Sequence, residues 1–303
     1  MKRLALASLI AAIAAACSDR TPPAAAPRAP SGDAACASCH AAIVEEHRAS
    51  LHRASFTDGT FQASLALEEP KEHAFCIGCH APAKDRAAGV DCASCHGTAP
   101  HEVRRQATCA GCHEFAFDGR PELVQKTLTE HAASDYAAVA CADCHLPARD
   151  GHRDHRFLAG HAPERIARAV HVDVSRAGDA TVRVAIRVDA GHAFPTGDMF
   201  RRARLLVFGE GADGAIVASA ERTFGRTWTG LRDGPNAGAR TEASDTRIRG
   251  SWTEDVALDE VSSPAPPIVR VRWSLVFERV VAMRPPHITL ASSDVLREGE
   301  LSW

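Results

Sequence analysis

The chain has 303 residues, which is enough for one large domain or two of ordinary size. Its formal net charge is -3 at pH 7 with acidic and basic residues interspersed, so no basic face indicates nucleic-acid binding. Its 11 cysteines and 16 histidines stand beside only 3 methionines and 1 tyrosine. Such an excess indicates disulfides, metal sites or a cofactor held by cysteine and histidine.

The N-terminal residues are typical of an export signal. An apolar run over residues 4–16 follows Lys2 and Arg3 and is too short to span a bilayer. Two processing routes are open: cleavage after small residues, or a lipoprotein-type signal in which Cys17 carries lipid. Cys17 is the one cysteine outside a pair, and residues 18–33 are rich in Pro and Ala, as in an extended tether. We expect residues 1–17 to direct export to the periplasm or cell surface, with a membrane anchor on Cys17.

The other ten cysteines form five Cys-x-x-Cys-His motifs, numbered here in chain order. They are Cys36-Cys39-His40, Cys76-Cys79-His80, Cys92-Cys95-His96, Cys109-Cys112-His113 and Cys141-Cys144-His145. Two thiols at this spacing can each add to one vinyl group of a porphyrin, and the adjacent motif histidine then binds the iron. The repeat predicts five covalently bound c-type haems.

Zinc is the main alternative, because paired cysteines also build zinc ribbons. A ribbon takes four ligands from two pairs, whereas this chain has an odd number of pairs and a histidine after each. Disulfides within each pair would leave those histidines unexplained as well. The spacing therefore favours haem.

Each iron has a sixth position to fill. Methionine is an unsuitable source, because Met1, Met199 and Met283 all lie outside the haem-binding segment. Eleven histidines lie outside the motifs, and nine of them precede residue 172. We expect ligation by two histidines at most irons, which gives low-spin haems of low potential.

Residues 34–165 resemble a family of multihaem c-type cytochromes that includes the tetrahaem electron carrier of ammonia oxidisers (cytochrome c-554-like). The resemblance rests on Ser50-Leu51-His52-Arg53-Ala54, on Gly89-Val90-Asp91, on Cys95-His96-Gly97 followed by His101, and on Cys144-His145-Leu146-Pro147 followed by residues 152–161. Leu146 stands where the family often has Met, at a position not expected to bind iron.

The resemblance implies which histidines take the sixth positions. It assigns His52, His101, His155 and His161 as distal ligands. His131, in an expected helix over residues 121–131, is our choice for the fifth, with His47 next. We expect His73 at the surface and keep His152 and His171 in reserve.

From residue 166 the pattern changes to that of β-strands. Alternating apolar residues at 182–188 and 269–277, with further candidates at 203–209 and 215–224, indicate short strands separated by Gly/Asp turns. Residues 225–246 are expected to form a long polar loop. The fold class predicted is α+β: a haem-packed, mostly helical domain at 34–165 and a β-sandwich at 166–303.

One segment of the second half, Gly191-His192-Ala193-Phe194-Pro195-Thr196-Gly197, has two interpretations. It resembles a segment of β domains appended to multihaem cytochromes of this kind, in which case His192 reaches a haem iron. The other interpretation, which we favour here, is a turn between strands with Phe194 packed inside.

The motifs predict an exported electron carrier that serves unidentified redox partner proteins. A multihaem oxidoreductase acting on a small nitrogen or sulfur compound is the alternative and needs one iron with an open sixth position. A structural surface lipoprotein would leave five haems unexplained. We favour the carrier, which would have no catalytic residues.

Overall fold

The computed structural model describes residues 33–83, 85–96, 107–116, 122–197, 200–230, 240–284 and 287–303. The expected signal segment, Cys17 and the tether at 18–33 lie almost wholly outside these ranges. Helix accounts for 29% of the structure and strand for 41%. This confirms the prediction that the chain contains both. Within these ranges, no helix has the length and apolar character needed to cross a membrane.

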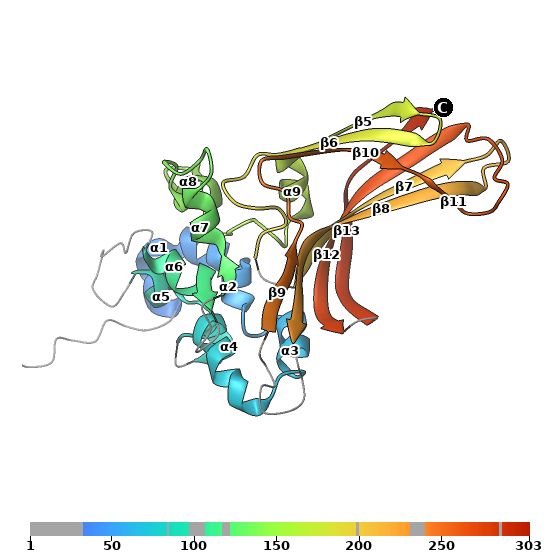
Figure 1. Ribbon diagram of the computed structural model, residues 1–303. Coiled ribbons are helices and arrows are strands. Elements are labelled where there is room, and N and C mark those ends of the chain that lie inside the picture. The colour runs from blue at the N-terminus through green and yellow to red at the C-terminus, as the bar shows by residue number, and fades with distance from the viewer. Residues whose placement is uncertain are drawn as a thin grey trace, which may run out of the picture.

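The first half, here called the helical region (residues 33–169), consists of short helices (Figure 1). They are α1 Asp33–Arg48, α2 Leu51–Ala54, α3 Gly59–Leu65, α4 His73–His80, α5 Cys92–His96, α6 Ala107–His113, α7 Thr127–Ala132, α8 Cys141–His145 and α9 Pro163–Ala169, with single turns η1 Pro70–Glu72 and η2 Arg86–Ala88. Two small hairpins join them: β1 Glu114–Ala116 with β2 Leu123–Lys126, and β3 Ala148–Arg149 with β4 His152–Arg153.

Each Cys-x-x-Cys-His motif lies on a helix, and its histidine marks a helix end or kink. Helices α4, α5, α6 and α8 end at the motif histidine, and α1 is kinked at His40 (φ -122°, ψ 41°). Because residues three apart share one helix face, a single turn brings the two thiols of a motif together. Four of the five motifs therefore lie at the C-terminal end of a helix.

The helical region buries few apolar side chains. Among its described residues they are those of Val44, Leu65, Ala81, Val124 and Ala162.

The second half, here called the β region (residues 170–303), has two antiparallel sheets. One has the order β10-β6-β5, and the other β11-β8-β7-β12-β13 with β9 paired to β8. The strands are β5 Val170–Gly178, β6 Thr181–Val188, β7 Arg201–Glu210, β8 Ile216–Gly230, β9 Arg240–Asp245, β10 Ser251–Ala257, β11 Asp259–Glu260, β12 Arg270–Arg284 and β13 His287–Ser302.

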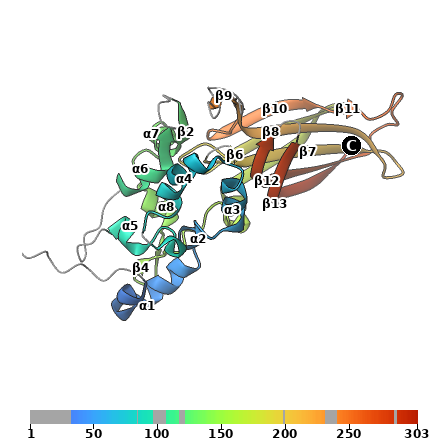
Figure 2. The same cartoon turned by 90° about the horizontal axis from the view of Figure 1, so that it is seen from below.

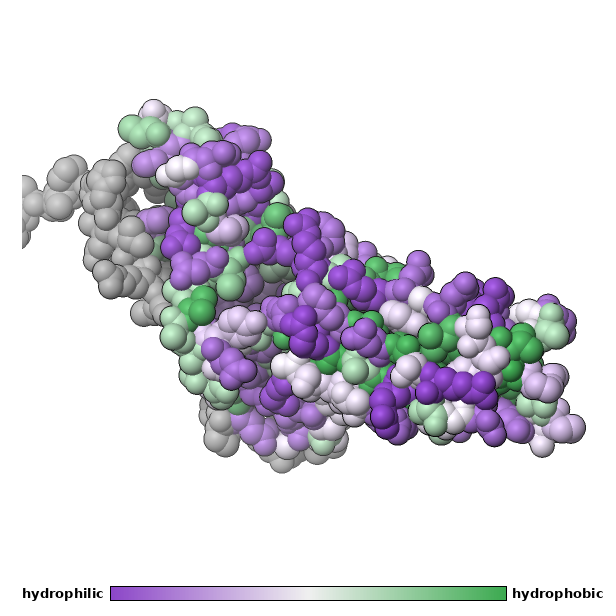
Figure 3. All heavy atoms as spheres, turned by 90° about the horizontal axis from the view of Figure 1, so that it is seen from above, coloured by the Kyte–Doolittle hydropathy of each residue, from purple (hydrophilic) through white to green (hydrophobic). Residues whose placement is uncertain are grey.

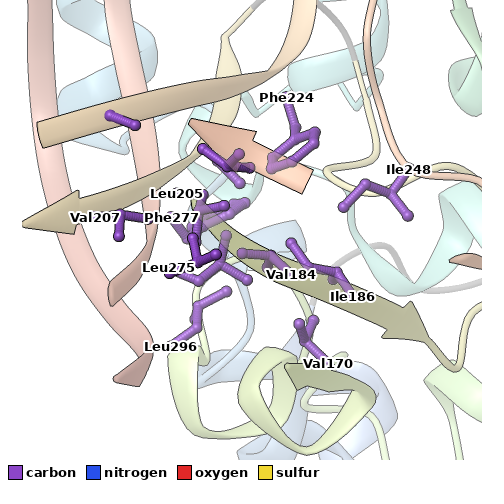
Figure 4. Packing of buried hydrophobic residues seen from close by; sticks show 14 of the residues in the cluster. Val170, Val184, Ile186, Leu205, Val207, Phe224, Ile248, Leu275, Phe277 and Leu296 are labelled. Atoms are coloured by element: carbon purple, nitrogen blue, oxygen red, sulfur yellow. The ribbon is translucent and has the colours of Figure 1, made fainter. Parts of the chain in front are cut away.

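One apolar core joins the two sheets. Val184 and Ile186 of β6 pack with Leu205 of β7 and with Leu275 and Phe277 of β12 (Figure 4). On β6 every second residue is buried, as the alternation in the sequence predicted. On the face shown in Figure 3, apolar residues lie among polar ones over the strands.

Strands were found where periodicity predicted β6, β7, β8 and β12, but two expectations were wrong in part. Residues 225–246 are not all loop, because β8 continues to Gly230 and Arg240–Asp245 forms β9. Their polar side chains are engaged in ion pairs, which hides the strand pattern. Residues 121–131 are not all helix: Leu123–Lys126 pairs with β1, and α7 begins at Thr127.

The two regions meet at several places (Figure 2). The β8–β9 hairpin lies against β2, where Arg226 donates to the carbonyl of Leu123 at 2.7 Å. Helix α3 lies beside β12, and Ser64 donates to the carbonyl of Val281 at 3.0 Å. The β region is thus attached to the helical region through these polar contacts and through α9, whose Ile166 and Ala167 pack against the core of the β region.

Truncating Leu275 tests the shared core. Leu275 is fully buried, so Leu275→Ala should lower the free energy of unfolding by about 2–5 kcal/mol. The matched control is Val269→Ala, because Val269 is 45% exposed. Urea midpoints followed by tryptophan fluorescence measure both, and equal shifts for the two variants would contradict the assignment of the core.

Candidate functional site

Cysteines of different motifs lie beside one another in the helical region. The ten motif cysteines are free thiols. Hydrogen bonds join the thiols of Cys36 and Cys92, of Cys79 and Cys112, and of Cys109 and Cys141. Burial, with Cys36 next, raises the pKa of Cys92 to about 12, and burial raises that of Cys95 to about 11. Groups attached to these cysteines would be close neighbours.

Three motif histidines each face a second histidine at one common distance. The ring centroids are 6.2 Å apart in His113–His52, in His96–His155 and in His145–His192. The angles between the ring planes are 80°, 28° and 20° in that order. Each pair joins a helix end to a distant part of the chain.

This distance is the one expected for two imidazoles on opposite sides of one metal ion. An imidazole nitrogen binds a metal at about 2 Å and lies roughly 1 Å from its own ring centroid, so centroids in such a pair lie about 6 Å apart. Both ring planes contain the line through the metal, so any angle between them is allowed. The pairs therefore fit an iron held by two axial histidines.

Hydrogen bonds separate the histidines into two groups. In His80, His155 and His192 the nitrogen Nδ1 contacts a backbone carbonyl, at 3.0, 2.7 and 3.3 Å. In His113 it contacts the Gln125 amide at 2.9 Å. A metal-bound histidine commonly donates its other ring N–H to a carbonyl, and in His155 and His192 this leaves Nε2 for a metal. In His113, by contrast, Nδ1 accepts from the amide nitrogen of Gln125.

Other histidines engage Nε2 itself. Their partners are Val90 O for His47, Glu68 O for His73, Glu46 Oε1 for His152 and Asp189 Oδ2 for His171, at 2.9–3.2 Å. A nitrogen held in such a bond is a poorer metal ligand. None of these four histidines is a first choice for a distal ligand from the sequence.

Burial keeps several of the paired histidines neutral, which is the form that binds metal. Burial, with His113 next, lowers the pKa of His52 to about 4. Burial, with His192 next, lowers the pKa of His145 to about 4. Burial also lowers the pKa values of His96 and His192.

His161 is a further candidate ligand. Its Nε2 atom is buried and has no hydrogen-bond partner, and burial lowers its pKa. A buried polar atom without a partner is rare and calls for an explanation such as a bound group. Its selection as a distal ligand stays a prediction.

The remaining predicted ligands have different places. His101 lies outside the described residues. Gly191 packs against the ring of His131, because a Cβ added to Gly191 would lie 2.8 Å from His131 Cδ2. His192 rather than His131 faces His145. His40 and His47 both belong to α1, with His40 exposed and His47 buried.

Local contacts determine where the distal rings lie. Glu46 of α1 accepts from the backbone N–H of His155 at 3.0 Å. The Phe157 ring lies edge-on to the His52 ring at 4.4 Å and to the His155 ring at 6.0 Å. Phe157 therefore separates two of the candidate metal centres.

Gly89 packs against the backbone of α2, the helix that carries His52. Its φ is +60°, and an added Cβ would lie 2.5 Å from the carbonyl oxygen of His52 and 2.6 Å from that of Arg53. The next residue, Val90, donates its N–H to the same His52 oxygen at 2.8 Å. Only glycine allows this approach.

The contact between His192 and His145 could not be predicted from the sequence. Its distance from the motifs along the chain gave no indication of contact with His145. The one sequence feature that could have indicated such a contact is Gly191 before His192, since a glycine allows another part of the chain to approach the backbone closely. That signal could not identify the partner.

Replacing Gly89 tests the support of His52. Gly89→Ala should lower the free energy of unfolding by about 1–3 kcal/mol, because the backbone becomes strained and α2 must shift. Thermal unfolding of the purified protein measures the change. Gly59→Ala is the control, since nothing lies within 4 Å of its added Cβ, and a loss as large there would count against the explanation.

Comparison with known proteins shows a shared fold. No family model and no curated protein matches the chain. The crystal structure of a penta-heme cytochrome c552 from Thermochromatium tepidum aligns with a TM-score of 0.66 and 20% identity, over 88% of this chain and 97% of that one. MtrC from Shewanella baltica OS185 aligns with a TM-score of only 0.19 and 14% identity, over 84% of this chain and 44% of that one, which is too low to show a shared fold. The chain is thus similar in fold to a penta-heme cytochrome.

Proposed function

We propose that this protein is a pentahaem c-type cytochrome that transfers electrons. The observation that carries the proposal is the set of three histidine pairs at 6.2 Å, each containing one motif histidine. Five attachment motifs and the fold shared with a penta-heme cytochrome support the same conclusion.

In this proposal the ten motif cysteines hold the haems and the motif histidines bind the irons from one side. His52, His155 and His192 bind from the other side on the fourth, third and fifth haems. His161 and His101 are our choices for the remaining two positions. A bound haem supplies one-electron oxidation and reduction, and histidine on both sides favours a low potential.

The protein's own residues keep three of the centres closed. A second imidazole occupies the position that a substrate would need, and carbonyl groups beside Nδ1 keep the rings in one orientation. The pairs that face one another therefore favour electron transfer over substrate chemistry.

Contacts between motifs suggest the order in which electrons pass. Thiol pairs connect the first motif with the third, the second with the fourth, and the fourth with the fifth. Phe157 lies between the distal histidines of the third and fourth. The fourth haem is therefore a branch point, with the third, second and fifth haems as its neighbours.

We also propose that the protein works outside the cytoplasm, attached to a membrane by lipid on Cys17 and exchanging electrons with redox proteins. The support is the charged and apolar N-terminal pattern and the Ala/Pro-rich tether at 18–33.

Haem content and carbon monoxide binding test the proposal directly. Purified protein should carry five haems, measured by the pyridine haemochrome method, and the reduced form should show no carbon monoxide difference spectrum. Binding by about one haem in five would instead favour an oxidoreductase with an open site. Fewer than five haems would contradict the assignment of the motifs.

Electron paramagnetic resonance of the oxidised protein tests the pairing. Nearly perpendicular rings in His52–His113 should give a low-spin signal with a large maximal g value, whereas the nearly parallel pairs should give rhombic signals. His52→Met should remove the first signal and shift one redox transition to higher potential, because a Met/His iron has the higher potential. His73→Met is the control, and loss of the same signal there would refute the pairing.

A further inference from the structure

Two arginines of the β region lie beside the segment that carries His161. Arg201 of β7 and Arg279 of β12 are directly opposite one another in the antiparallel pairing of the two strands. Arg279 donates from Nε to the carbonyl of Gly160 at 2.8 Å. A Cβ added to Gly160 would lie 3.5 Å from Nε of Arg201. Both guanidinium groups therefore border the residue that precedes His161.

This pair of positions brings like charges together. Opposite charges facing one another across two strands stabilise a sheet, whereas like charges directly opposite destabilise it. The neighbouring pair is favourable, because Arg202 lies opposite Glu278 and forms an ion pair with it. Beside Arg201 and Arg279 there is Asp294, which pairs with Arg279 at 3.0 Å. That one carboxylate leaves one positive charge in excess.

Arg201 carries the excess charge. Within the described part of the chain it forms no ion pair with a carboxylate, and its side chain donates one hydrogen bond, from Nη1 to the carbonyl of Thr196 at the long distance of 3.4 Å. A guanidinium has five N–H donors in a planar fork that fits a carboxylate. The described residues therefore leave most of the hydrogen-bonding capacity of this half-buried side chain unused.

Two glycines provide the space for this guanidinium. It lies beside Gly160, and a Cβ added to Gly197 would collide with its Nη1 atom. Gly197 also has a φ of +105°, a conformation that residues with a side chain rarely adopt. The backbone thus holds the guanidinium of Arg201 in place without a counter-charge.

Unpartnered polar atoms lie in the same place. Thr196 Oγ1 and His161 Nε2 are both buried and have no hydrogen-bond partner. Thr196 also provides the carbonyl that Arg201 contacts, and His161 follows Gly160. Such atoms are rare in folded proteins and call for a bound group. A haem has both groups that these residues lack: an iron for the imidazole, and propionate carboxylates for the guanidinium and the hydroxyl.

We propose that Arg201 and Thr196 bind a propionate of the haem beside His161. This inference rests on the proposed haem binding and deepens it, since it gives a role to two residues that are neither attachment sites nor iron ligands. Arg201 compensates the negative charge of the propionate. A cation near an iron favours the reduced form electrostatically, so the β region raises the potential of this haem.

Removing the charge of Arg201 tests the inference. Arg201→Gln should keep five haems with unchanged low-spin signals. At a fixed potential, one haem should lose roughly tenfold in its ratio of reduced to oxidised form, which is about 59 mV for a one-electron couple. Potentiometric titration measures this change, and resonance Raman spectroscopy should show a shifted propionate bending band.

Two further variants serve as controls. Arg201→Lys keeps the charge and should retain most of the potential, which a merely structural role of the guanidinium would not predict. Arg183→Gln removes an exposed arginine of β6 that pairs with Asp255. It should leave all five redox transitions unchanged.

The outcomes distinguish the sources of the negative charge. Five unchanged transitions and an unchanged propionate band in Arg201→Gln would overturn the inference and leave the cytochrome assignment intact. A small anion from solution would instead make one transition of the unmutated protein depend on added sulfate at constant ionic strength, with no change in the propionate band of Arg201→Gln. That result would also overturn the inference. Fewer than five haems in the unmutated protein would overturn the proposed function itself.

A second position covers the case in which Arg201→Gln does not fold. Thr196→Val removes the hydroxyl but keeps the shape of the side chain and the charge of Arg201. It should shift the propionate bending band while the five potentials change little. An unchanged band in Thr196→Val would contradict the binding of a propionate at this site.

Discussion

The meeting of two imidazoles at 6.2 Å is the constraint on which the rest of this structure depends. One ring of each pair is fixed locally, because the motif histidine follows its cysteines at a helix end. The other ring must be delivered by a segment distant in the sequence. Three connections place these distant rings. A two-residue gap before α2 precedes His52, the hairpin after α8 precedes His155, and the strand connection at 191–197 contains His192. The helices α4, α5, α6 and α8 each end at the histidine of the one motif that they carry.

Buried charges and apolar packing both join the two regions, because Ile166 and Ala167 of α9 pack against the core of the β region. Arg226 is 2% exposed and contacts Glu242 and the carbonyls of β2, and Lys126 of β2 contacts Asp245 at 3.2 Å. Burying charges costs free energy unless every one is paired, and removing one partner of such a pair costs several kcal/mol. The interface is therefore specific in register, because a shifted contact would leave a charge buried and unpaired.

The sequence predicted the local features and missed those that depend on distant contacts. Spacing identified every motif, and alternation identified β6 and β12, since both are set by residues a few positions apart. The strand at Arg240–Asp245 was missed because its polar residues are stabilised by Arg226 and Lys126 from elsewhere. The segment with His192 was interpreted as a turn between strands, because nothing near His192 in the sequence indicates that His145 is its neighbour.

The two halves of the chain differ in what makes them stable. The β region has a continuous apolar core that needs no cofactor, whereas the described part of the helical region buries few apolar side chains. Loss of chain entropy on folding must be offset by burial, so short helices with so little core depend on what their cysteines and histidines bind. The β region then supports the helical region in two ways. It provides a stably folded neighbour, and its loop places His192 beside His145. The buried contact between Glu130 and Arg247 holds that loop against α7, in addition to the apolar packing of the loop.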